Sequence, residues 1–151
     1  MSQPIQGRIL ALDLGRRRIG LAVSDQLGVT AQGLPTLERS NMREDLERLT
    51  RLATERGVGS ILIGNPVRMN GSEGAGSAWV REFAGRLERH SGYRVTLWDE
   101  RLTTVEASRV LRESGISREK RGRAVDRLAA VILLQSYLES CSAAASGDEG
   151  G

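Results

Sequence analysis

Aromatic side chains are scarce in this chain of 151 residues, at 3% of the sequence. Their scarcity requires an aliphatic core and leaves little surface on which nucleic-acid bases could stack. The single cysteine, Cys141, excludes an internal disulfide and is typical of a reducing compartment. No run is long and apolar enough to span a bilayer, and the N-terminus lacks the basic and apolar regions of a secretory signal. We therefore expect a cytoplasmic protein without a membrane partner.

Lysine is also nearly absent, since Lys120 is the only lysine among 22 basic residues. The arginine side chain is a planar fork that binds phosphate and carboxylate groups well. A coding bias that raises arginine, alanine and glycine together would give the same composition. The net charge of +3 is a modest surplus, so charge alone makes nucleic acid a plausible partner and supports nothing stronger.

The pattern of apolar residues predicts one α/β domain over residues 8–140, with a flexible N-terminus at 1–7 and a disordered tail at 141–151. The order of elements predicts a mixed sheet with helices packed on its faces. Right-handed crossovers would make the fourth and fifth strands parallel to the first. Apolar residues nearly encircle the last helix, so we expect it to be largely buried. The expected strands are 8–14, 18–24, 30–38, 58–64 and 93–98; a helix begins after Asn41, and others cover 77–90, 103–113 and 125–140.

Carboxylates from three separate segments are expected at one edge of this sheet. Asp13 lies near the end of the first strand, Asp99 and Glu100 follow the last strand, and Asp126 lies in the first turn of the last helix. Ligands of open α/β sheets gather at the carboxyl ends of the parallel strands. Clustered carboxylates repel one another unless a cation joins them, and Mg²⁺ or Mn²⁺ suits their oxygen atoms.

Each of these acids also has a purely structural interpretation. Asp13 could be a turn residue, Asp126 a charge that favours a helix N-terminus, and Asp99 with Glu100 part of a solvated loop. Their agreement in position favours a common site. Asp25 falls at the opposite end of the sheet and is expected to be a turn residue.

Glycine-rich and basic segments flank the expected edge. The loop GNPVRMNGSEG, residues 64–74, is flexible enough to approach a phosphate backbone, but it lacks the lysine and the spacing of a P-loop. A basic run between Arg109 and Arg127 is either a solvated face or a phosphate contact. Trp79 and Trp98 are expected in the core rather than as stacking platforms.

Four segments together resemble the YqgF/RuvX family of ribonuclease H-like nucleases: LALDLGRRRIGLAVSD, GNPVRMNGSEG, DERLTT and VDRLAAVILLQSYL. The resemblance implies a ribonuclease H-like, five-stranded sheet of order 3-2-1-4-5 with helices on both faces. It also implies metal-dependent cleavage of nucleic-acid phosphodiesters, either at the 5′ end of pre-16S rRNA or in Holliday junctions. Carried over by position, Asp13, the Asp99-Glu100 pair and Asp126 match the catalytic acids and metal ligands of the family.

Two segments depart from the family pattern, the loop at residues 68–71 and the strand that ends at Gly64. Asn70 stands where the loop usually carries an aspartate, and Arg68 is an added arginine. Gly64 stands where junction resolvases of this superfold carry an acid. The second ligand must then come from one strand further out, ~9–10 Å from the first strand. That distance favours the longer Glu100 and leaves Asp99 as the alternative.

The resulting hypothesis is a two-metal nuclease in which Asp13 bridges two Mg²⁺ or Mn²⁺ ions, and Glu100 and Asp126 complete the cage. The expected partner is structured or precursor rRNA, or branched DNA, with no small-molecule substrate; the oligomeric state is left open. The expected phosphate contacts are Arg16, Arg17, Arg18, Arg68, Arg101, Arg121 and Arg123.

Two other functions remain open from the sequence. The pattern DLGxxxxGxAVxD also resembles the phosphate hairpin of actin-like and sugar-kinase-like ATP sites, which need two such domains where this chain has the length of one. A non-catalytic RNA-binding module for ribosome assembly would retain the same fold.

Overall fold

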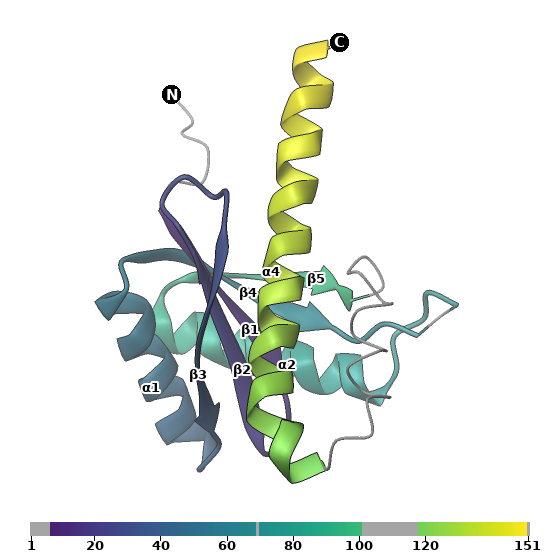
Figure 1. The fold of residues 1–151 in the computed structure, drawn as a ribbon. Coiled ribbons are helices and arrows are strands. Elements are labelled where there is room, and N and C mark those ends of the chain that lie inside the picture. The colour runs from purple at the N-terminus through teal and green to yellow at the C-terminus, as the bar shows by residue number, and fades with distance from the viewer. Residues whose placement is uncertain (1–6, 69, 101–117, 151) are drawn as a thin grey trace.

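The computed structural model describes residues 7–68, 70–100 and 118–150, and three helices and five strands lie in this part of the chain (Figure 1). The strands β1 and β2 have the predicted bounds, β3 and β4 differ from prediction by one residue at one end, and β5 is shifted by one residue at both ends. None of the helices found here is long and apolar enough to cross a membrane. In chain order the elements are β1 Arg8–Leu14, β2 Arg18–Ser24, β3 Ala31–Glu38, α1 Met42–Glu55, β4 Val58–Asn65, α2 Ala75–Ser91, β5 Arg94–Asp99 and α4 Arg118–Gly150.

The strands form one mixed sheet of order β3-β2-β1-β4-β5. β1 pairs antiparallel with β2 and parallel with β4, and β5 is parallel to β4. The predicted hairpin, the predicted strand order and the predicted parallel crossovers are therefore confirmed. The carboxyl ends of β1, β4 and β5 share one edge of the sheet, which we call the carboxyl edge.

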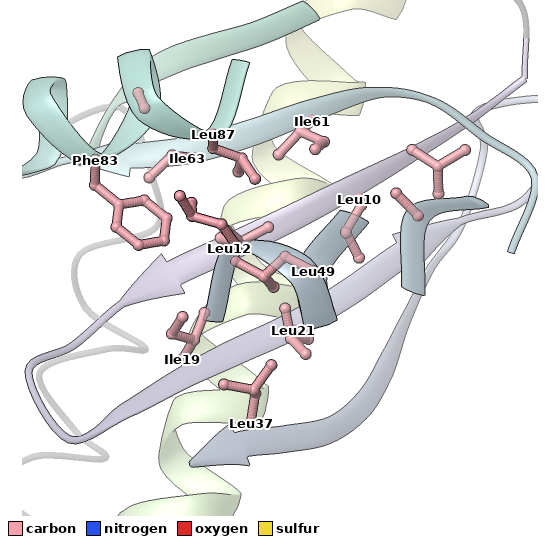
Figure 2. Packing of buried hydrophobic residues seen from close by; sticks show 14 of the residues in the cluster. Leu10, Leu12, Ile19, Leu21, Leu37, Leu49, Ile61, Ile63, Phe83 and Leu87 are labelled. Carbon is pink, nitrogen blue, oxygen red and sulfur yellow. The ribbon is translucent and has the colours of Figure 1, made fainter. Parts of the chain in front are cut away.

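Helices cover both faces of the sheet, as predicted. Leu10 and Leu12 of β1 pack in the core that α1 and α2 cover, and Figure 2 shows them beside Leu49 and Leu87. Ile9 and Ala11, the alternate residues of β1, pack in a second core under α4. Because successive strand residues point to opposite faces, Asp13 falls on the α4 face.

The helix α4 differs from prediction in length and burial. It runs for 33 residues to Gly150, through the segment where the composition predicts a disordered tail, and its C-terminal part extends past the sheet (Figure 1). Propagating an established helix costs little, and the alanines at 143–145 favour it. Over residues 125–142, where burial is described, only one side of the helix is buried, through residues such as Leu134 and Leu138, whereas Leu128 is 39% exposed. The predicted helix 103–113 lies outside the described residues.

Candidate active site

Asp13 and Asp126 are brought together by a glycine. Asp13 pairs with Gly20 across the β1–β2 ladder. The main chain of Asp126 in α4 packs directly on Gly20, because a Cβ atom built there would overlap the Asp126 carbonyl oxygen. The close approach therefore requires glycine at this position and fixes the start of the buried part of α4 beside the end of β1.

Glu100 is placed by a second glycine, Gly64 of β4. The Glu100 carboxylate lies over this position, with Oε1 2.8 Å from where a Gly64 Cβ would be. The neighbouring Leu62 packs under α4 and Ile63 packs in the opposite core, so the open side of Gly64 faces α4. Glu100 thus lies on the α4 face, as Asp13 does.

Asp99 belongs to the other face of the sheet by strand alternation. It pairs in register with Asn65, the residue after Gly64. Trp98, one residue earlier, packs in the core under α4, so Asp99 falls on the α2 side. The structure therefore separates the two acids that the sequence could not distinguish, and it is Glu100 that shares a face with Asp13 and Asp126.

The Asp126 carboxylate is held by an arginine from the next strand. Arg18 at the start of β2 donates from Nε to Asp126 Oδ2 at 3.1 Å, and each side chain is about one-quarter exposed. Among the described residues, no three His, Cys, Asp or Glu side chains are gathered as a ready metal-binding group. Asp13, Glu100 and Asp126 share one edge and one face, and Asp126 forms an ion pair with Arg18 there.

The remaining predicted arginines lie around this edge in different settings. Arg16 is placed 4.8 Å from the Trp79 ring centroid, a cation–π contact, and Arg17 is exposed in the β1–β2 turn. The Arg68 guanidinium lies against the backbone of Gly74, the N-cap of α2. Arg121 and Arg123 belong to the first turns of α4, and Arg101 lies outside the described residues.

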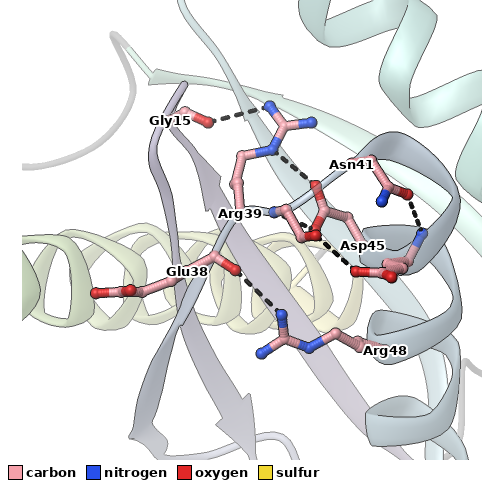
Figure 3. A network of polar contacts seen from close by, with 8 residues as sticks. Gly15, Glu38, Arg39, Asn41, Asp45 and Arg48 are labelled. Carbon is pink, nitrogen blue, oxygen red and sulfur yellow. Dashed lines mark hydrogen bonds and ion pairs between the residues drawn. The ribbon is translucent and has the colours of Figure 1, made fainter.

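A polar network that the sequence did not predict fixes the β1–β2 turn (Figure 3). Arg39 donates from Nε to Asp45 Oδ2 at 3.1 Å and from Nη1 to the Gly15 carbonyl at 3.3 Å. Asp45 is fully buried in the first turn of α1 and also accepts from the Ser40 amide. The Arg39 amide donates to the Arg17 carbonyl at 2.8 Å. Both ends of the turn that precedes Arg18 are therefore tied to α1.

The first turn of α1 contains the predicted N-cap and a second hydrogen bond that joins Glu44 to Ser40. Asn41 Oδ1 accepts from the Glu44 amide at 2.9 Å, which is the N-cap predicted from the sequence. The Glu44 carboxylate accepts from the Ser40 hydroxyl at 2.6 Å. The predicted turn role of Asp25 is confirmed, because its Oδ1 accepts from the amides of Val29 and Thr30.

Polar side chains in the loop after β4 bond to one another and to the neighbouring elements. Glu73 binds Arg81 at 2.6 Å and accepts from Asn65 Nδ2 at 3.0 Å. The hydrogen bond from Arg81, aided by that from Asn65, lowers the pKa of Glu73 below its usual value. Asn70 accepts from the amide and hydroxyl of Ser72, the role of a turn residue. Glu73 thus links the end of β4, next to Gly64, to α2.

Comparison with known proteins places the chain among nucleases. The family model RuvX, described as Holliday junction resolvase, matches residues 7–140. A protein of Koribacter versatilis named "Putative pre-16S rRNA nuclease" is 53% identical over 141 residues, which cover 92% of each chain. One of the same name from Thermoanaerobacter pseudethanolicus is 48% identical over 134 residues, covering 88% of this chain and 96% of that one.

Two solved structures have the same fold at low sequence identity. RuvC of T. thermophilus in complex with Holliday junction substrate matches with a TM-score of 0.57 and 14% identity, over 89% of this chain and 96% of that chain. The fowlpox virus resolvase in complex with Holliday junction DNA matches with a TM-score of 0.55 and 14% identity, over 89% and 98%. The ribonuclease H-like fold expected from the sequence is thereby shown.

Proposed function

Because the chain belongs to the RuvX family, we propose that it is a nuclease that hydrolyses phosphodiester bonds of pre-16S rRNA with the help of Mg²⁺ or Mn²⁺. The names of relatives that match nearly end to end support the substrate. The observation that carries the proposal is that Asp13, Glu100 and Asp126 fall on one face at the carboxyl edge: Asp126 packs on Gly20, the register partner of Asp13, and Glu100 lies over Gly64. A protein that acts on precursor rRNA is expected in the cytoplasm.

The donor set fits a hard divalent cation. Asp13, Glu100 and Asp126 would hold it, since carboxylate oxygens are the ligands that Mg²⁺ and Mn²⁺ prefer. Glycine at positions 20 and 64 lets Asp126 and Glu100 approach the sheet where a side chain would stand in their way. When bound, such an ion makes water a better nucleophile and stabilises the leaving oxygen.

The protein's own part in the reaction is to hold the acids and the substrate backbone. The Arg39–Asp45 pair fixes the β1–β2 turn, so exposed Arg17 and the neighbouring Arg18 start from a defined position. Arg17 and Arg68 would bind phosphates outside the acid cluster, which gives affinity that falls as salt rises. Aromatic stacking on bases contributes little here, because Trp79 is packed between the core and arginines.

The proposal is tested by cleavage of an RNA that carries the 5′ end of pre-16S rRNA, with Mg²⁺ or Mn²⁺. Asp13→Asn and Asp126→Asn should each lower the rate at least about 100-fold while the circular dichroism spectrum and urea midpoint stay close to wild type. The matched control is Asp25→Asn, because Asn retains the turn's oxygen acceptor at the opposite end of the sheet. Folded Asp13 and Asp126 variants that cleave as fast as wild type would rule the mechanism out.

Cleavage of Holliday junctions is the second candidate, favoured by the description of the family model. A junction needs two cuts, and hence two copies of this site. The same assay therefore includes a four-way DNA junction, with the molecular mass of the active species measured by light scattering. Binding of RNA without cleavage of either substrate, under either ion, would favour a non-catalytic role in ribosome assembly.

A further inference from the structure

Arg18 stands out among the arginines of the β1–β2 hairpin because it contacts one of the candidate metal ligands, Asp126. It precedes Gly20 by two residues on β2, so both fall on the α4 face. Its Nε lies 3.1 Å from Asp126 Oδ2. The sequence predicted a phosphate contact for Arg18, whereas the structure places its guanidinium on one of the proposed metal ligands.

The main chain of Asp126 is fixed in place, whereas its carboxylate can move. The main chain of Asp126 is pressed against Gly20 and cannot approach β2 more closely. The carboxylate can still rotate about its side-chain bonds. Both side chains are about one-quarter exposed, so water can take the place of each partner when the pair separates.

We propose that Arg18 is an internal counter-ion that competes with the divalent ion for Asp126. This inference rests on the proposed function, because it takes Asp126 as a metal ligand. With Arg18 present, the acid cluster is partly neutralised and Asp126 has a fixed partner. A divalent ion must separate this pair and then bind beside a positive charge. Arg18 therefore acts through Asp126, as a positioning residue that weakens metal binding and keeps the cluster ordered.

The size of the effect follows from the charges. A single and a double positive charge separated by about 6 Å, with the dielectric constant of water, repel enough to change affinity roughly tenfold. Loss of the Arg18–Asp126 pair also raises the affinity for the divalent ion, because Asp126 is then free to bind it. Stronger repulsion among the three carboxylates raises the affinity as well. Removing the charge at position 18 should therefore tighten Mn²⁺ binding about tenfold.

The experiment measures Mn²⁺ binding to the whole protein by isothermal titration and by the rise in melting temperature, at low ionic strength and without nucleic acid. Arg18→Gln and Arg18→Met remove the charge, so one remains informative if the other fails to fold. Arg18→Lys keeps the charge and should bind Mn²⁺ about as wild type does. Arg17→Gln is the matched control, because it removes the same charge one residue away from an exposed side chain and should change affinity far less.

Three outcomes separate the inference from the function on which it rests. Tighter Mn²⁺ binding by the charge-free variants at position 18, with Arg17→Gln and Arg18→Lys near wild type, supports the competition. Wild-type binding of Mn²⁺ with equal or weaker binding by Arg18→Gln and Arg18→Met overturns the competition and leaves the metal-dependent nuclease standing. Failure of the wild type and all variants to bind Mn²⁺ overturns both.

Discussion

Replacing Gly20 by alanine is the sharpest test of how the fold builds the site. The position has no need of glycine's conformational freedom, because Gly20 is not among the glycines with positive φ. The change is therefore purely steric. The new Cβ would overlap the Asp126 carbonyl oxygen and lie 3.2 Å from the Asp126 Cα. Both obstacles are backbone atoms, so no side-chain rotation relieves them, and α4 has to move away from β2 by about 1 Å or more to reach ordinary contact.

That movement has two measurable consequences. Overpacking of this kind costs about 1–3 kcal/mol of unfolding free energy, which equilibrium unfolding in urea resolves. A displacement of about 1 Å in a catalytic group costs roughly 100-fold in rate, and cleavage of the pre-16S substrate would show it.

The control is Gly85→Ala in the interior of α2, where the nearest obstacle outside the helix backbone is the flexible end of Arg89 at 3.2 Å. It should gain about 0.5–1 kcal/mol because alanine favours helix more than glycine does, with activity unchanged. Wild-type stability and activity in Gly20→Ala would show that Asp126 is not held by this contact.

Three further predictions follow from the same contacts. Gly64→Ala meets only the flexible end of Glu100 at 2.8 Å, so its urea midpoint should stay near wild type while cleavage falls about tenfold or more; an unchanged rate would remove Glu100 from the site. Asp45→Ala leaves the largely buried Arg39 without its carboxylate partner and should lose about 3 kcal/mol in urea unfolding, whereas Glu47→Ala, which breaks an exposed pair with Arg43, should lose less than about 0.5 kcal/mol. The lowered pKa of Glu73 means that its stabilising pair with Arg81 is present above the usual pKa of 4.5 and is lost as the pH falls through the lowered value; the difference in urea midpoint between wild type and Glu73→Gln should shrink over that acidic range.

Much of the fold could be predicted because its signals are local. The apolar runs of β1 and β2 and the intervening Gly-Arg-Arg specify a hairpin within 17 residues, Arg8–Ser24. Asn41 marks the start of α1, and its capping hydrogen bond forms as expected. Chirality then fixes the crossovers to β4 and β5. The convergence of Asp13 and Asp126 on one edge follows from that topology.

The choice between Asp99 and Glu100 could not be made from the sequence, because it depends on the last residues of β5. The regular alternation of side chains stops at the end of this strand. If the strand were one residue longer or shorter, the acid facing α4 would be the other one of the pair. The Arg39–Asp45 pair was missed for a different reason. An aspartate in the first turn of a helix is explained by the helix dipole alone, and nothing local indicates that Asp45 is fully buried against an arginine from the preceding loop.

Gly20 and Gly64 are sequence signals of the positions where acidic segments approach the sheet. Glycine inside a strand weakens it, and often marks a place where another part of the chain comes close. Gly20 interrupts an otherwise apolar β2, and Gly64 stands near the end of an apolar β4. Each glycine is covered by an acidic residue from another segment of the chain. Asp126, which covers Gly20, is more than 100 residues away in sequence, and Glu100, which covers Gly64, comes from the end of the neighbouring strand. The missing side chain at each glycine is therefore what allows the acidic residue from the other segment to lie at that position. It explains how β4, a strand without an acid of its own, can still lie beside the candidate acids. It also explains why substitution at either glycine should displace an acidic residue of the site more than it disturbs the sheet.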